Sequence, residues 1–284
     1  MKNILMATDL SARSDRALER AVNLAREHGA SLLVAHIIDS DLPEYLAEAQ
    51  KKAAEQILHG HLKTLTAEES APSSIQVQVD FGRAFVDILD LSDKTEADLI
   101  VLGTHREDTL KDMFRGTTAE RVIRAAEAPV LLVKERYNAP YRKIMVGIDF
   151  SVYSRRAIEF AIRFAPKSQF HLIHAYDVPF RGFLSGDDTQ KDILKQHQAQ
   201  FQKMIEHEMA TFLTSLEPNA PQLERVLQQG TVWQVIHDQI SKIAPDVLVI
   251  GTHGRTGVPH AVLGSVAEDL LERPPCDVLA VNAW

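Results

Sequence analysis

Glycines and a serine near the carboxyl end of the chain have the spacing of a loop that binds phosphate. Gly251 ends an apolar run, Gly254 follows after two intervening residues, and nine further residues lead to the pair Gly264-Ser265. Glycines let backbone amides approach a bound group with no Cβ in the way. Ser265 can cap the following helix or donate its hydroxyl to a phosphate, and the free amides of a helix N-terminus favour an anion. The segment predicts a phosphate-binding loop, although glycines that only form tight turns are the plainer alternative.

Two aspartates, Asp9 and Asp149, follow the first apolar run of each half of the chain in the pattern Asp-x-Ser. In an open parallel sheet, ligands bind beyond the carboxyl ends of the strands, where the strand order reverses. Each aspartate can therefore contact a ligand there, or it can simply cap the helix that follows.

The histidines and the cysteine do not indicate a metal site. The chain has 12 histidines, and the closest groupings are His59 with His61 and His171 with His174. Neither grouping has a recognised ligand set with carboxylates at matching spacing, so we expect surface or hydrogen-bonded histidines. The single cysteine, Cys276, excludes an internal disulfide, and its apolar neighbours favour a packed strand residue over a reactive thiol.

Motifs of common nucleotide-dependent enzymes are missing from the sequence. It has no Gly-x-x-x-x-Gly-Lys-Ser/Thr loop, and the first apolar run of neither half is followed by Gly-x-Gly-x-x-Gly. These absences disfavour a P-loop enzyme, a dinucleotide-dependent oxidoreductase and an adenylating enzyme. We expect no catalytic residues.

The elements that must position these residues occur twice. Residues 4–11 match residues 144–151 at an offset of 140, and residues 97–105 match residues 245–253 at an offset of 148. Matches that keep register over so many positions indicate duplication. The larger second offset predicts an insertion in the second copy near residues 177–190, which is either a lid or partner surface or an ordinary loop.

Strand-like and helix-like runs alternate in both copies. A proline-containing stretch separates the copies, so we predict domains at 1–137 and 141–284. In the first copy the predicted strands are Asn3–Thr8, Ser31–Ile38, Ile75–Asp80, Asp98–Thr104 and Pro129–Lys134, and the predicted helices are Ala12–His28, Leu42–Glu69, Ala84–Thr95 and Thr117–Ala126. In the second copy the predicted strands are Lys143–Ile148, Phe170–Tyr176, Leu223–Gln228, Asp246–Gly251 and Asp277–Val281.

This pattern predicts two tandem α/β domains. The strands are nearly continuous apolar runs, which is typical of a parallel sheet covered by helices on both faces. Alternation of the two element types implies right-handed crossovers. We therefore predict two doubly wound, five-stranded parallel sheets with a Rossmann-like arrangement. The second helix of the second copy, near Lys191–Leu216, has an apolar stripe that we expect to be core: Ile193, Phe201, Met204, Ile205, Phe212 and Leu216.

Charge and composition restrict the partners. The formal net charge is −8, and the lysines and arginines are scattered along the chain. This distribution disfavours binding to nucleic acid or to an anionic membrane, because both need a basic face. The sequence shows neither a signal peptide nor a membrane-spanning run, so we expect a cytoplasmic protein.

The loop after the fourth strand of the second copy resembles that of the universal stress protein (UspA) family, and the resemblance covers essentially the whole chain, twice. In the ATP-binding branch of that family the loop holds ribose and phosphates, while the ends of the first two strands hold the base. The resemblance implies that the second copy binds ATP or AMP, with Mg²⁺ and slow hydrolysis left open. The residues implied are Gly147, Ile148, Asp149, Ala175, Ile250, Gly251, Gly254, Gly264, Ser265 and Val266.

The first copy departs from the family pattern in this loop. Arg106 occupies the position of Gly254, and Glu107 and Asp108 add negative charge beside it. A side chain at this position disfavours a positive φ and fills space that phosphates need. We predict a degenerate, mainly structural first copy, with an Arg106-assisted site for another anion as the alternative.

Function and assembly follow from the same resemblance. It implies a stress-response protein with a nucleotide-dependent regulatory or protective role. A nucleotide-free interaction scaffold for an unknown protein partner is the alternative. Single-domain relatives commonly dimerise through their fifth strands, so residues 129–134 and 277–281 are expected to pair within the chain as a pseudo-dimer. A further homodimer stays open.

Overall fold

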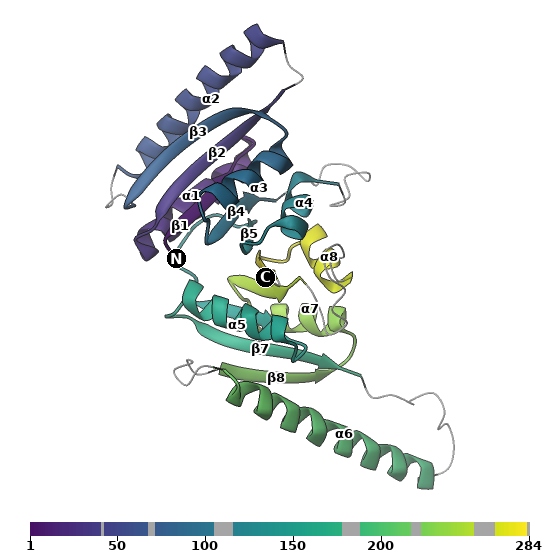
Figure 1. The fold of residues 1–284 in the computed structure, drawn as a ribbon. Helices are drawn as coiled ribbons and strands as arrows, with labels where there is room; N and C mark the ends of the chain where they lie inside the picture. Colours follow the sequence, from purple (N-terminus) through teal and green to yellow (C-terminus); the bar gives the residue numbers. More distant parts are fainter. Residues whose placement is uncertain are drawn as a thin grey trace.

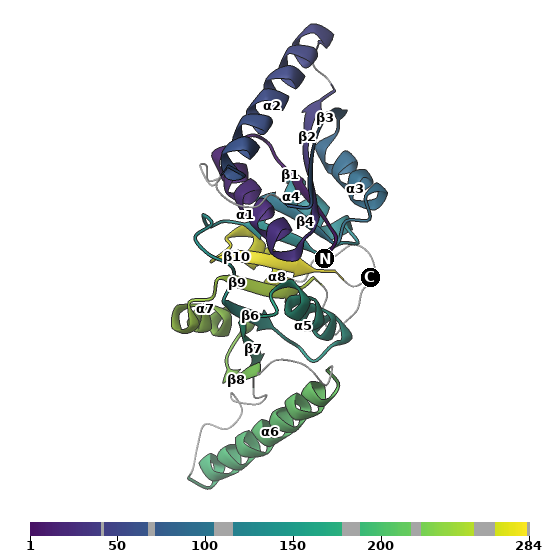
Figure 2. The same cartoon turned by 90° about the vertical axis from the view of Figure 1, so that its left-hand side faces the viewer.

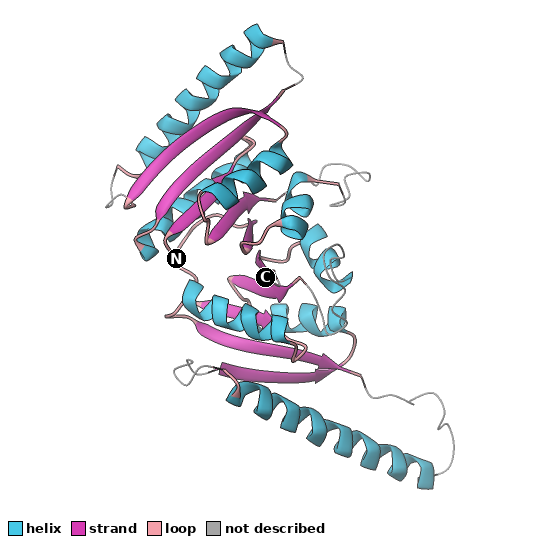
Figure 3. Ribbon diagram, viewed as in Figure 1, coloured by secondary structure: helices cyan, strands magenta, loops and turns pink. Residues whose placement is uncertain are grey.

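The computed structural model describes residues 1–40, 43–67, 72–104, 116–177, 188–216, 223–252 and 265–282. Strands and helices alternate through both halves of the chain (Figures 1 and 3). The first half comprises β1 (Asn3–Ala7), α1 (Ala12–His28), β2 (Ser31–Asp39), α2 (Glu44–Leu65), β3 (Ser74–Gly82), α3 (Ala84–Lys94), β4 (Leu99–Gly103), α4 (Thr118–Ala125) and β5 (Val130–Val133). The second half comprises β6 (Lys143–Gly147), α5 (Val152–Phe164), β7 (Gln169–Tyr176), α6 (Asp188–Thr214), β8 (Leu223–Gln229), α7 (Val232–Ile243), β9 (Val247–Gly251), α8 (Ser265–Glu272) and β10 (Asp277–Val281).

The ten strands form one continuous sheet in the order β3-β2-β1-β4-β5-β10-β9-β6-β7-β8. Neighbouring strands are parallel within each half. The halves meet where β5 and β10 pair antiparallel, with Leu131 opposite Leu279. The predicted tandem α/β fold is confirmed, with the two predicted five-stranded parallel sheets joined edge to edge in one sheet, and so is the predicted contact between the two fifth strands.

Helices cover both faces of the sheet because the strands are apolar on both sides. One buried cluster includes Leu18, Leu58, Phe164 and Met209, which belong to α1, α2, α5 and α6. The other includes residues of α3, α4, α7 and α8, and both clusters continue through the two halves. Figure 2 shows α1 and α3 on opposite sides of the first-half strands.

Local caps fix where the first helix of each half begins. Ser11 lies before α1 and its side chain accepts a hydrogen bond from the Ser14 amide. Ser151 accepts in the same way from the Ser154 amide before α5. A capping hydroxyl satisfies an amide that has no partner within the helix, so the start of each helix is determined by a few neighbouring residues.

Two residues of the expected apolar stripe on α6 are not in the buried core, since Phe201 is only half-buried and Met204 is exposed. Met204 is 53% exposed, whereas Ile205, Phe212 and Leu216 are buried. Met209 is buried instead, because it follows Ile205 by four residues and lies on the same face of the helix. The Ile193 side chain lies outside the described residues, as do residues 178–187 of the expected insertion. The longer second copy is visible in α6 itself, which has 27 residues against 22 in α2.

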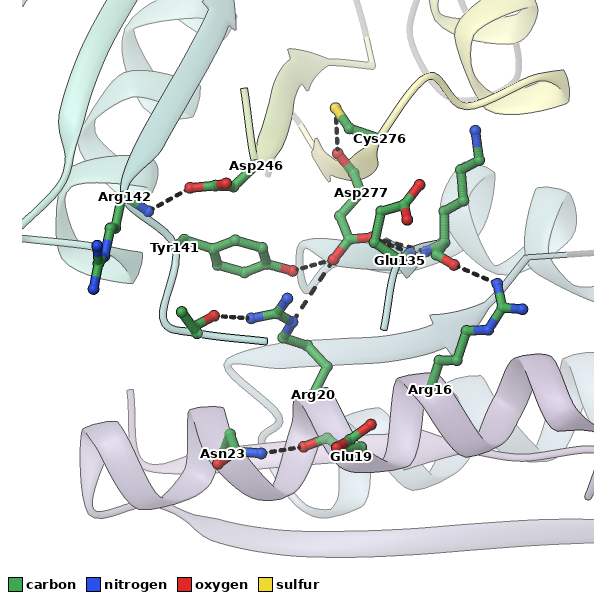
Figure 4. A network of polar contacts seen from close by, with 12 residues as sticks. Arg16, Glu19, Arg20, Asn23, Glu135, Tyr141, Arg142, Asp246, Cys276 and Asp277 are labelled. Carbon is green, nitrogen blue, oxygen red and sulfur yellow. Dashed lines mark hydrogen bonds and ion pairs between the residues drawn. The ribbon is translucent and has the colours of Figure 1, made fainter. Parts of the chain in front are cut away.

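A buried carboxylate ties the halves together at their junction (Figure 4). Asp277 accepts hydrogen bonds from the Tyr141 hydroxyl at 2.6 Å and from the backbone amides of Lys134 and Glu135 at 2.8 and 2.9 Å. The Arg20 Nε lies 3.7 Å from this carboxylate, and the guanidinium stacks 4.1 Å from the Tyr141 ring centre. Helix α1, the linker between the halves and β10 therefore share one polar contact.

Burial also determines the chemistry of the neighbouring thiol. Cys276 is buried, and its burial raises the pKa of the thiol to about 12. A thiol with so high a pKa is protonated at neutral pH and is a poor nucleophile.

Among the described helices, none combines the length and the apolar character that crossing a membrane requires.

Candidate functional site

A cavity of about 290 Å³ lies at the carboxyl ends of β6, β7 and β9 in the second half. Strand β6 pairs with β7 on one side and with β9 on the other, so the strand order reverses beside it. The cavity is lined by Gly147, Ile148, Asp149, Ser154, Ile173, His174, Ala175, Val232, Ile236, Ile250, Gly251, Thr252, Val266, Ala267 and Leu270. This is the position at which open α/β sheets bind ligands.

The structure brings most of the predicted site residues together. Those that line this cavity are Gly147, Ile148, Asp149, Ala175, Ile250, Gly251 and Val266. Gly254, Gly264 and the side chain of Ser265 lie outside the described residues, although Ser265 begins α8 as expected. The predicted residues come from four separate segments, so the fold, rather than proximity in sequence, assembles the cavity wall.

Asp149 organises the turn between β6 and α5. Its Oδ1 accepts hydrogen bonds from the Ser154 hydroxyl at 2.5 Å and from the Ser151 amide at 3.0 Å. Its own amide donates to the Ser154 Oγ at 2.9 Å. Asp149 is not itself the helix cap that was its alternative role, because Ser151 caps α5. Asp149 supports that cap through Ser151 and Ser154, and it also lines the cavity.

The turn contains a backbone conformation that sequence reasoning missed. Phe150 has φ of 63°, and Leu10 at the equivalent place in the first half has φ of 60°. Side chains disfavour this left-handed region by roughly 1–2 kcal/mol. The Phe150 ring centre lies 4.2 Å from that of His174, so packing holds the turn in place.

His174 is one of the cavity residues that the sequence did not reveal as a site residue. Its Nδ1 lies 2.9 Å from the Ile148 carbonyl oxygen. Because a carbonyl only accepts, Nδ1 carries the proton in this contact. His36 makes the same contact with the Thr8 carbonyl at 2.8 Å in the first half. Repetition of this histidine within the second strand of both copies was the available signal.

Other lining residues also escaped prediction. Ser154 could have been found, because Asp-x-Ser-x-x-Ser recurs as Asp9-Leu10-Ser11-Ala12-Arg13-Ser14 and Asp149-Phe150-Ser151-Val152-Tyr153-Ser154. The apolar wall carries no such signal, since its residues resemble any other core positions: Ile173, Val232, Ile236, Ala267 and Leu270. Thr252 lies within the repeated segment at residues 245–253, but the repeat alone does not mark it as a site residue.

A second cavity, of about 480 Å³, occupies the equivalent place in the first half. Its lining is more polar and includes Asp9, Arg13, His36, Thr104 and Thr117. Burial alone would raise the pKa of Asp9, but hydrogen bonds from Ser11 and Ser14 outweigh it and hold that pKa below its ordinary value.

The helix that begins beside the first-half cavity already has an acidic cap. Thr117 accepts a hydrogen bond from the Glu120 amide, and the Gly116 amide donates to the Glu120 carboxylate. A carboxylate at a helix N-terminus occupies the place that a bound anion would take. Arg106 and its acidic neighbours, on which the degenerate-copy prediction depends, lie outside the described residues.

The histidine groupings have other partners. His171 is buried and its Nδ1 lies 3.0 Å from the Glu224 carboxylate, while His61 lies 3.4 Å from Asp15. In the part of the chain that the structure describes, no group of three or more His, Cys, Asp or Glu side chains is arranged to hold a metal ion.

Comparisons with known proteins agree on one family. The model of the Universal stress protein family matches residues 1–134 and 140–282. A universal stress protein of Methanocaldococcus jannaschii is 32% identical over 143 residues, which are 47% of this chain and 82% of that protein.

Solved structures share the fold over the whole chain. A universal stress protein from Archaeoglobus fulgidus has a TM-score of 0.69 and 22% identity, covering 99% of this chain and 98% of that one. A protein of Pseudomonas aeruginosa described as functionally unknown has a TM-score of 0.65 and 20% identity, covering 99% and 92%.

Proposed function

The chain belongs to the universal stress protein family, and from this premise we propose that its second half binds an adenine nucleotide, ATP or AMP. The nucleotide would occupy the cavity beside β6 and β9 and would set the protein's regulatory or protective activity under stress. The observation that carries the proposal is the convergence of seven residues implied by the family resemblance, from four segments, on that one cavity.

The walls of the cavity suit a flat base. Ile148, Ile250 and Val266 present aliphatic surface, and most of the lining is apolar. Ligand pockets are typically apolar with a few placed polar groups and hold roughly 300–1,000 Å³. At about 290 Å³ the described cavity fits a base and part of its ribose. Phosphates would then extend toward the segment that follows Gly251, which carries the glycine spacing of the predicted loop.

Asp149 supplies the acceptor for this ligand. Its carboxylate is fixed by Ser151 and Ser154, so it would receive a ribose hydroxyl or an exocyclic amine without first becoming ordered. Pre-ordered polar groups reduce the entropic cost of binding. The sequence lacks a P-loop lysine, which supports binding as a signal over rapid turnover, and Mg²⁺ would accompany the phosphates where the loop admits it.

A nucleotide-free interaction scaffold is the second candidate. Val232 lines the cavity yet is 41% exposed, and the adjacent Trp233 is 52% exposed. Exposed large apolar groups beside a cavity favour a protein contact there. In this case the protein would act through an interaction surface at this place and would need no bound nucleotide.

Analysis of released ligand separates the two candidates. We expect the purified protein, once denatured, to release about one adenine nucleotide per chain in chromatography. Protein stripped of ligand should regain thermal stability when ATP is added, because a ligand that binds only the folded state raises its stability as the ligand concentration exceeds Kd. Neither released nucleotide nor any shift in Tm with millimolar ATP would leave the scaffold as the better account.

A further inference from the structure

A single buried amide connects the two halves on the face of the sheet that carries α4 and α8. Asn282 follows β10 and is 6% exposed. Its Oδ1 accepts a hydrogen bond from the Thr252 hydroxyl at 2.6 Å. Its Nδ2 donates to the carbonyl oxygens of Ile123 at 3.0 Å and Ala126 at 2.5 Å. Both the oxygen and the nitrogen of the side chain are therefore engaged, one toward each half.

Thr252 is the partner in the second half, and it belongs to the candidate site. It lines the second-half cavity and is 1% exposed. Its amide donates to the Val281 carbonyl at 3.1 Å. Gly254, the first glycine after it, lies two residues further along the sequence. The contact with Asn282 therefore fixes a residue of the cavity wall.

Helix α4 is the partner in the first half. Ile123 and Ala126 lie at its carboxyl end, where carbonyl groups lack partners within the helix. Asn282 caps that end from the other half of the molecule. A second contact joins α4 to α8, since the Arg124 Nη2 lies 3.8 Å from the Glu268 carboxylate. Figure 1 shows the two helices side by side.

Comparison of the copies shows that the fold does not require this amide. The offset of 148 aligns Thr252 with Thr104, so the threonine is repeated. It aligns Asn282 with Lys134, whose backbone amide bonds to Asp277. Burying an amide side chain costs free energy unless its oxygen and nitrogen form hydrogen bonds. The three hydrogen bonds of Asn282 offset that cost, so this position suits an amide.

We propose that Asn282 is a positioning residue of the second-half site, through which the first half holds Thr252 in place at the wall of the cavity. The inference rests on the proposed function, because it takes the second-half cavity to be a ligand site. It also gives the first half a role in binding that is independent of any ligand of its own.

Substitutions at Asn282 and Thr252 test the bridge, which consists of the hydrogen bonds that Asn282 makes to Thr252 and to Ile123 and Ala126. Asn282→Asp keeps an oxygen for Thr252 but replaces the donor to Ile123 and Ala126 with an acceptor. Thr252→Val removes the hydroxyl at nearly constant shape, whereas Thr252→Ser retains it. Because one hydrogen bond contributes up to about 1.5 kcal/mol, we expect ATP affinity to fall about tenfold in Asn282→Asp and in Thr252→Val. Thr252→Ser should bind ATP as the wild type does.

Hydrogen exchange without ligand tests the bridge independently of nucleotide binding. In Thr252→Val we expect the amides of α4, in the other half, to exchange several times faster than in the wild type. Thr231→Val is the matched control, because the Thr231 hydroxyl caps α7 within the second half and should leave α4 unchanged.

Each outcome decides one of the two proposals. Wild-type protein that does not bind ATP would sink the proposed function, while the exchange of α4 would still decide the bridge. Unchanged exchange of α4 in Thr252→Val, or ATP affinity that survives in both Asn282→Asp and Thr252→Val, would overturn the positioning role. If Asn282→Asp does not fold, the contrast between Thr252→Val and Thr252→Ser gives the answer.

Discussion

At the scale of single residues, one polar pattern builds the same turn twice. In each half an aspartate accepts from two serines, and the residue after the aspartate takes a positive φ. The hydrogen bonds and the packing of Phe150 on His174 offset the strain of that conformation. A rigid turn at the end of the first strand presents Asp9 and Asp149 to their cavities without a mobile loop.

Filling one cavity at a time tests which half binds nucleotide. Ala175 and Ile37 occupy equivalent positions on β7 and β2, and each lines the cavity of its own half. Ala175→Phe should abolish the shift in Tm that ATP produces, because the added ring occupies the space proposed for the base. Ile37→Phe is the matched control and should leave the shift intact.

If Ile37→Phe abolished the shift in Tm that ATP produces and Ala175→Phe did not, the nucleotide site would lie in the first half. Gly254→Arg imports the residue that the first copy carries at position 106 and should also abolish the shift. Persistence of binding in that variant would show that the phosphates lie elsewhere.

Sequence reasoning found the residues that carry a recognisable pattern and missed those that do not. Asp149 could be predicted from its place after a strand and Gly251 from the glycine spacing, whereas Gly147 was implied by the family resemblance. The positive φ of Phe150 could not be predicted, since a bulky residue is uncommon in that region and its packing partner lies 24 positions away, at His174. Apolar lining residues such as Ile236 have the same local pattern as any core residue.

At the scale of helices and strands, local signals determined most boundaries. Helix α1 begins and ends where the sequence predicts, because Ser11 caps its start and Gly29 ends it with a φ of 61°. The wrong assignment of Met204 to the core has a tertiary cause. A stripe of six positions on a long helix is wider than the line of contact with the sheet, so only part of the stripe is buried.

Truncation of the two methionines of α6 should give opposite results. Met209 is 1% exposed, and Met209→Ala should lower the free energy of unfolding by about 2–5 kcal/mol. Met204→Ala should change it by no more than about 0.5 kcal/mol, since its side chain is 53% exposed. Urea unfolding followed by circular dichroism measures both. Equal losses would mean that α6 packs through a different face.

At the scale of the whole molecule, the junction between the halves is both apolar and charged. The β5 and β10 strands pair through buried Leu131 and Leu279. Beside them, Asp277 accepts hydrogen bonds from groups of the linker between the halves. The sequence predicted the strand pairing from the family resemblance. It could not predict the network around Asp277, because Arg20 and Asp277 lie 257 positions apart and neither belongs to a motif.

The junction should respond to pH. Burial raises the pKa of Asp277 above its ordinary value of 3.8, although hydrogen bonds from Glu135, Tyr141 and Lys134 oppose the rise. A carboxyl whose pKa is raised by folding contributes stability below its unfolded pKa, and that contribution is lost as the pH rises through the folded pKa. Asp277→Asn removes this titration.

The wild type should therefore exceed Asp277→Asn in free energy of unfolding by more at pH 4 than at pH 7. Urea denaturation of both proteins across this range measures the difference. A gap that widens toward neutral pH would mean that the ion pair with Arg20 outweighs the cost of burial.

The antiparallel pairing of β5 with β10 also sets the directions in which the two cavities open. Since the strands of the two halves run in opposite senses at this pair, the carboxyl ends of β1 and β4 lie at one rim of the continuous sheet and those of β6 and β9 at the other. Each cavity therefore opens at its own rim. A group bound at one rim would therefore leave the cavity at the other rim accessible.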